Sequence, residues 1–240
     1  MKNYFLIEQV LQDSKHVLIV IHLNSDYMIN KKLKKYIKKE ILPKYILNDE
    51  GHNLKHINYV IKRSIKFSKT VSNIDKNIVY TVAVYHDLGY YKDPKNHEKI
   101  AAEIFKNDNN IKAFFTEEEI NLIIEAIEDH RASKGIEPRN VYGKIIASAD
   151  KNVSVDDIIK RTYIYIIKYD DVDKNDFECI FNKIKEHITE KYGKKGYAIN
   201  NMYFKDKKYD KYLKKIDNLL DNEKKLEKNI KKLIKKTKGF

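Results

Sequence analysis

Apolar residues recur at intervals of three and four along most of this chain, and only three prolines, Pro43, Pro94 and Pro138, interrupt the pattern. Such spacing places the apolar side chains on one face of an α-helix, and no segment shows the strict alternation that is typical of a β-strand. Each proline falls where a helix is expected to break or a loop to begin. The sequence therefore predicts an all-α fold.

The ends of several helices can be placed from local signals. Thr116 stands at an N-cap position and Glu119 completes a capping box, so we expect a helix to begin there. The apolar segment that runs into "VYHDLGY" is expected to stop at Leu88-Gly89, because glycine readily adopts the conformations that end a helix. Further helices are expected at about residues 3–14, 27–47, 175–191 and 206–236.

The length of 240 residues suits one large domain, or one domain with an appendage. We expect an N-terminal helical extension at residues 1–48, a core at 49–170, and a C-terminal helical extension with a basic tail at 171–240.

The composition indicates a globular protein of a reducing compartment. The single cysteine, Cys179, excludes a disulfide framework and a thiolate metal cluster. No apolar run approaches the roughly 20 residues that span a bilayer. The start "MKNYFLIEQVLQDSK" contains acids and no small-residue cleavage site, so it does not resemble a signal peptide. We therefore expect a cytoplasmic protein without a membrane partner.

The net charge of +13 is concentrated in two lysine-rich segments. Residues 31–44 contribute +6 and residues 205–240 contribute +8, which leaves the rest of the chain near neutral. Basic segments can bind nucleic acid through its phosphates. A genome whose codons favour Lys, Asn, Ile and Tyr produces the same composition, so a nucleic-acid partner is not favoured.

Several residues that can bind a metal stand where apolar helices are expected to end. His86 and Asp87 are neighbours at the end of one such helix, and Asp150 closes the apolar run "KIIASAD". Burying these groups costs several kcal/mol unless something pairs with them. The candidate ligands in chain order are His52, His56, His86, Asp87, His97, His130 and Asp150.

Neutral imidazoles together with carboxylates bind divalent Mn, Fe, Co, Ni, Mg or Zn. Such an ion lowers the pKa of bound water and neutralises the charge that builds on a phosphoryl oxygen. This mixture of ligands therefore indicates a labile metal site suited to hydrolysis. We expect His16, His22 and His187 to be surface or core histidines without a role in the chemistry.

The order His … His-Asp … Asp, in "KHINYV", "YHDLGY" and "ASADK", resembles the HD-domain metal-dependent phosphohydrolase superfamily over about residues 50–170. "GHNLKHINYV" is similar to the first segment of the small bacterial HD hydrolase branch. The resemblance implies an HD-domain-like helical bundle, here with extra N- and C-terminal helices.

The resemblance also implies the ligand set. One metal ion would be held by His56, His86, Asp87 and Asp150, of which Asp87 would also serve catalysis. His52 would face the substrate or support a ligand, and we count it as a catalytic candidate. The segments "NHEKIAAEIF" and "IEAIEDHRAS" resemble those that hold a second metal in some branches, which nominates His97 and His130.

Substrate phosphate would be bound by cationic side chains. Lys92 lies in the loop where the superfamily often has a basic residue, while Arg131 and Arg139 can each clamp two phosphate oxygens. Each of these residues, like Lys151, could equally be a solvated surface cation. The general base stays open between Asp87 and Glu98.

Three functions are compatible with these residues. The first is a metal-dependent phosphohydrolase that acts on a phosphomonoester or a nucleotide through metal-activated water. The second is a diiron oxygenase of the HD fold, which would need the second metal site. The third is a module that binds RNA or another polyanion and retains a vestigial metal site.

Overall fold

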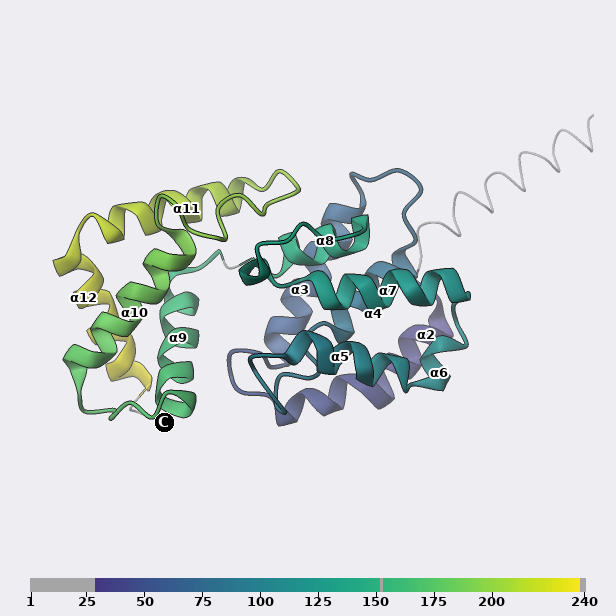
Figure 1. Ribbon diagram of the computed structural model, residues 1–240, viewed down its shortest axis with the longest axis horizontal. Coiled ribbons are helices and arrows are strands. Elements are labelled where there is room, and N and C mark those ends of the chain that lie inside the picture. Colours follow the sequence, from purple (N-terminus) through teal and green to yellow (C-terminus); the bar gives the residue numbers. More distant parts are fainter. Residues whose placement is uncertain (1–28, 152, 238–240) are drawn as a thin grey trace, which may run out of the picture.

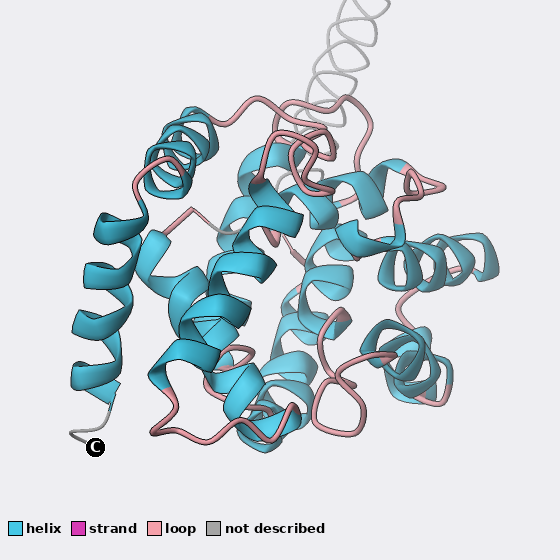
Figure 2. Cartoon of the chain, turned by 60° about the vertical axis from the view of Figure 1, so that its left-hand side comes forward, coloured by secondary structure: helices cyan, strands magenta, loops and turns pink. Residues whose placement is uncertain are grey.

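The computed structural model describes residues 29–151 and 153–237. Figure 2 shows helices joined by loops, and no strand occurs in this part of the chain, which confirms the all-α fold. The predicted helix at 3–14 lies outside the described residues. Across the described ranges, no helix combines the length and the apolarity that crossing a bilayer requires.

The helices form two groups that lie side by side (Figure 1). The first group comprises α2 (Lys31–Tyr36), the π-helical turn η1 (Ile37–Ile41), the 3-10 helices η2 (Leu42–Leu47) and η3 (Ala132–Lys134), α3 (Leu54–Ser68), α4 (Lys76–Tyr85), α5 (His97–Lys106), α6 (Asn109–Lys112), α7 (Glu117–Asp129) and α8 (Val141–Ala149). The second group comprises α9 (Val155–Tyr169), α10 (Phe177–Tyr192), α11 (Lys207–Leu220) and α12 (Glu223–Thr237).

Helix α4 is the centre of the first group. All its residues from Ile78 to Tyr85 are buried, and it packs against α3, α7 and α8. A helix that is apolar on every side must be enclosed by others, and "NIVYTVAVY" has that character. The C-terminal end of α4 therefore lies inside the protein, where a polar residue needs a partner.

The expected helix at 27–47 is divided into α2, η1 and η2. Pro43 stands at the start of η2, and it has no backbone N–H with which to continue an α-helical ladder. The chain nevertheless keeps one apolar face, because Leu33, Ile37, Ile41 and Tyr45 are all buried in the first core.

The prediction of one helix over 206–236 is wrong, because α11 ends at Leu220 and α12 begins at Glu223. Asn222 starts the new helix by accepting a hydrogen bond from the Lys225 backbone N–H at 3.0 Å. The turn folds α12 back, so that Leu226, Ile230 and Ile234 are buried in the second core. The basic C-terminal segment is thus docked along its apolar face up to Ile234.

Helix α9 packs with α10–α12, whereas residues 29–48 pack with the first group. The predicted domain boundaries at residues 48 and 170 stay a prediction.

A buried ion pair joins the two groups. The Arg63 guanidinium on α3 donates to Asp206 Oδ2 at 2.8 Å and to the Lys151 carbonyl oxygen at 2.5 Å. Asp206 also caps α11, because its Oδ1 accepts from the Lys208 backbone N–H at 3.0 Å. One carboxylate therefore ends a loop, starts a helix and anchors the second group to α3.

We expect Asp206→Ala to lower the free energy of unfolding by about 3–5 kcal/mol, because it leaves the buried Arg63 charge uncompensated. Urea denaturation followed by circular dichroism measures this loss. The matched control is Glu227→Ala, which removes the exposed pair with Lys231 and should cost about 0.5 kcal/mol or less. Equal losses in the two variants would contradict an anchoring role for Asp206.

Candidate metal centre

The end of α4 delivers two neighbouring polar residues into the core. His86 is the C-cap of α4, and the turns that follow direct Asp87 inward, so both side chains are buried. Gly89 allows α5 to lie against this turn. A Cβ at residue 89 would lie 2.6 Å from the His97 carbonyl oxygen and 2.8 Å from the Ala101 nitrogen. The close approach brings the start of α5 beside Asp87.

Four side chains from three separate segments converge here. His56 Nε2 on α3 lies 3.2 Å from Asp87 Oδ2 and 3.0 Å from Asp150 Oδ1 at the end of α8. His86 Nε2 lies 3.3 Å from the same Asp87 oxygen. The four ligand atoms are all within 4.8 Å of one another, as the predicted ligand set requires.

This arrangement fits a cation between the four groups. His56 Nε2, His86 Nε2, Asp87 Oδ2 and Asp150 Oδ1 are all buried and have no hydrogen-bond partner among the described residues. Leaving a buried polar atom unsatisfied costs about 1–3 kcal/mol. A divalent ion held by all four would satisfy them together, and imidazole with carboxylate is a suitable donor set for it.

A second set of ligand atoms lies on the other side of Asp87. Asp87 Oδ1 is 3.2 Å from His97 Nε2 and 3.6 Å from His130 Nε2, and the two nitrogens are 3.1 Å apart. Asp87 therefore directs one oxygen to each set of ligand atoms.

The tautomers of three histidines follow from their contacts. Each Nδ1 lies within hydrogen-bond distance of a carbonyl oxygen, which can only accept, so Nδ1 carries a proton and a metal-binding ring would have its lone pair on Nε2. The contacts are His86 to Ala83 at 3.0 Å, His97 to Pro94 at 2.8 Å and His130 to Ile127 at 2.7 Å. Such contacts orient histidines that bind metals.

The Nε2 atoms of His97 and His130 thus face each other at 3.1 Å. Two bare nitrogens repel at that distance unless a proton or a cation lies near both of them. The second set is therefore also suited to a metal ion.

Electrostatics keep both carboxylates charged. Burial raises the pKa of Asp87, but the surrounding histidines, His86 first among them, outweigh this effect and hold the pKa well below its usual range. Burial likewise opposes ionisation of Asp150, and His56 lowers its pKa again.

His52 is not among the ligand atoms of either set. Its Nδ1–H donates to Asp49 Oδ1 at 2.8 Å, and its Nε2 accepts from Arg161 Nη2 at 2.5 Å. The ring stacks on Tyr90 with the centroids 3.5 Å apart. Burial and the Arg161 charge lower the pKa of His52 to about 3, so it stays neutral. It links the neighbourhood of His56 to α9.

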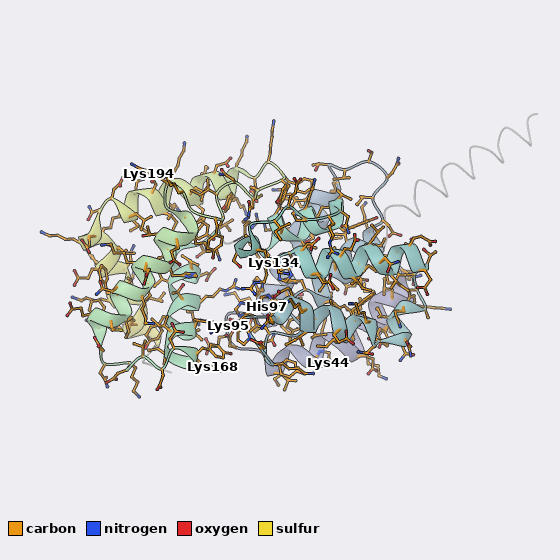
Figure 3. All side chains as sticks on the ribbon, in the orientation of Figure 1. Lys44, Lys95, His97, Lys134, Lys168 and Lys194 are labelled. Atoms are coloured by element: carbon orange, nitrogen blue, oxygen red, sulfur yellow. The ribbon has the colours of Figure 1, made fainter. Side chains whose placement is uncertain are left out.

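A cavity of about 550 Å³ opens from the centre toward the second group of helices. Asp87, His97, His130 and Asp150 line one side of it. Figure 3 shows His97 with Lys95 and Lys134 on the face of the first group that is turned toward the second.

The structure brings only one of the three predicted phosphate-binding residues to this cavity. Arg131 lines it, held by Glu98 Oε2 at 3.1 Å and by the Lys95 carbonyl oxygen. Arg139 and Lys92 do not line it. Arg139 pairs with two carboxylates at the end of α7, and Lys92 is an exposed residue on another hollow, beside Tyr36. Ion pairing of Arg139 and exposure of Lys92 account for these positions.

Sequence reasoning missed the opposite wall, which includes Arg161 on α9 and Lys191 on α10. His187, for which no chemistry was expected, also lines this wall, and burial with the nearby Lys191 and Arg161 lowers its pKa to about 4. One signal in the sequence could have pointed to Arg161, because this lysine-rich chain has only four arginines. Two of them, Arg131 and Arg161, lie at the cavity.

The family model of the HD domain matches residues 53–152. None of the curated proteins and none of the solved structures matches the chain.

We expect Gly89→Ala to destabilise the fold by about 1–3 kcal/mol, because the new methyl group meets backbone atoms of α5 that cannot rotate away. Thermal unfolding measures the effect. Lys99→Ala, at an exposed position of the same helix, is the control and should change stability by less than about 0.5 kcal/mol. A stable Gly89→Ala variant would show that α5 does not depend on this close contact.

Proposed function

We propose that this chain, which belongs to the HD-domain superfamily through residues 53–152, is a metal-dependent phosphohydrolase that acts on a small phosphorylated molecule such as a nucleotide. The observation that carries the proposal is the set of buried, unsatisfied ligand atoms around Asp87, open to a cavity with cationic walls. The small bacterial branch of the superfamily stays a prediction.

The residues divide into two ligand sets that share Asp87. His56, His86, Asp87 and Asp150 would hold one ion, and Asp87, His97 and His130 a second. When bound, such ions lower the pKa of coordinated water and offset charge on a phosphoryl group. The absence of thiolates and the number of imidazoles favour Mn, Fe, Co or Ni.

Arg131 is the proposed phosphate ligand on the near side of the cavity. Glu98 is almost fully buried and binds both Arg131 at 3.1 Å and Lys134 at 3.2 Å. A carboxylate already engaged by two cations is a poor proton acceptor, which favours a role for Glu98 in positioning Arg131. Asp87 is no better an acceptor, because its two oxygens face the two ligand sets, so we assign it as a metal ligand and the general base stays open.

The same six ligands would also suit two irons, so a diiron oxygenase is the second candidate. Two irons per chain after anaerobic purification, together with a product that requires O₂, would favour it over hydrolysis. The described lysines of segments 31–44 and 205–237 do not line the cavity, and we assign them no part in the reaction.

Metal content tests the two ligand sets. We expect the dialysed chain to bind about two Mn²⁺ ions, and His97→Ala to retain about one, because that substitution removes a ligand from the second set only. Elemental analysis measures the ions, and the wild-type chain should gain about 2.7 kcal/mol of stability at a metal concentration of 100 Kd. Arg139→Ala should keep both ions. Full metal content in His97→Ala would contradict the second set.

Turnover tests the function itself. In a panel of nucleotides and phosphomonoesters with Mn²⁺, we expect release of phosphate or pyrophosphate that a chelator stops. Asp87→Ala should lower kcat/KM on the order of 1,000-fold or more, with the helical circular dichroism signal retained, because both ligand sets lose their shared carboxylate. Arg139→Ala should remain active. No hydrolysis across the panel with several metals would refute the proposal.

A further inference from the structure

Three cations that line the cavity belong to neither ligand set. Arg161 on α9 and Lys191 on α10 come from helices beyond the HD-domain match, and Lys151 directly follows Asp150. These three residues, defined by lying outside both ligand sets, are called the distal wall below. All line the same cavity as Asp87 and Asp150.

Lys151 is buried without a partner. Its side chain is 4% exposed, and its Nζ has no hydrogen-bond partner within the described part of the chain. An unpaired ammonium group in such a place is costly, and structures retain one where an anion is to be bound or a charge is otherwise compensated. The position of Lys151 in the cavity lining makes a bound anion the simplest compensation.

Arg161 and Lys191 are also unpaired, in the sense that neither has a carboxylate within 4 Å among residues 29–151 and 153–237. Arg161 instead donates to the neutral His52 at 2.5 Å. Of the other cations of this cavity, Lys183 pairs with Asp170 at 3.1 Å, Arg131 pairs with Glu98, and Lys95 is exposed.

The three charges also crowd one another. Burial and then the Arg161 charge lower the pKa of Lys191 to about 8. Two acids on this wall, Glu186 and Glu190, are exposed and form no ion pair within the described ranges. The charge of Asp150 attracts Lys151 and Lys191, and a bound anion would offset the remaining repulsion between the cations.

We infer that the distal wall is a second anion-binding subsite, and that the substrate carries two phosphate-type groups, one at the metal centre and one at Lys151, Arg161 and Lys191. This inference rests on the proposed function. Compounds of this class are pyrophosphate, nucleoside diphosphates and nucleoside triphosphates. A volume of about 550 Å³ lies within the range of ligand pockets for such molecules and is too small for a folded nucleic acid.

Two probes that cannot be hydrolysed separate the subsites by isothermal titration calorimetry. Methylphosphonate presents one anionic group, and methylenebisphosphonate presents two. We expect the Mn²⁺-loaded wild-type chain to bind the bisphosphonate at least about tenfold more tightly, because charge-assisted hydrogen bonds to the distal wall add to those at the centre. Equal affinities for the two probes would overturn the inference.

Variants test whether the tighter binding of the bisphosphonate comes from the distal wall. Arg161→Gln and Lys191→Met should each weaken bisphosphonate binding about tenfold and methylphosphonate binding by less than about threefold. Arg139→Ala should keep the full difference between the probes. Equal weakening of both probes, or no weakening, would refute a separate subsite. The two substitutions lie on different helices, so if one of them unfolds the chain, the other still gives the answer.

The outcomes for the function and for the subsite are distinguishable. Tighter binding of the bisphosphonate without any turnover would support the subsite and contradict the proposed phosphohydrolase activity. Turnover of phosphomonoesters with equal affinities for the two probes would support the phosphohydrolase activity and contradict the subsite.

Discussion

A charged carboxylate at the buried end of an apolar helix is the constraint from which the rest of the site follows. Asp87 is 2% exposed, and four histidine nitrogens lie within 3.6 Å of its two oxygens. Helices α3, α5 and α7 each contribute one of those histidines, and the end of α4 contributes another. The packing of the first group is thus the means by which one buried charge acquires its partners.

The same local hydrogen bond at a helix end orients two of these histidines. His86 and His130 each follow the last turn of a helix, where backbone carbonyls lack an intrahelical partner, and each ring donates Nδ1–H to the carbonyl three residues earlier. The helix end gains a satisfied acceptor and the ring gains a fixed orientation. Secondary structure therefore determines which nitrogen faces Asp87.

The ligand set could be predicted because its order along the chain resembles a known family, and because His86, Asp87 and Asp150 end apolar runs, which is a local property. Arg161 and Lys191 could not, since their position depends on how the second group docks through Arg63 and Asp206, which are 143 residues apart. Lys92 and Arg139 do not line the cavity, because neighbours in space decide which way an exposed cation points. The turn at Asn222 between α11 and α12 could not be predicted either, because it depends on the packing of α12 into the second core.

Asp150 and Lys151 are consecutive, so one peptide unit carries a proposed metal ligand and a cation of the distal wall. The Lys151 carbonyl is in turn fixed by Arg63 on α3. A small rigid-body movement of the second helix group would shift Arg161 and Lys191 relative to the metal centre. The distance between residues 150 and 151 would hardly change. The covalent backbone thus fixes the distance between the metal centre and Lys151. The distance from the metal centre to Arg161 and Lys191 can adapt to the length of the bound ligand.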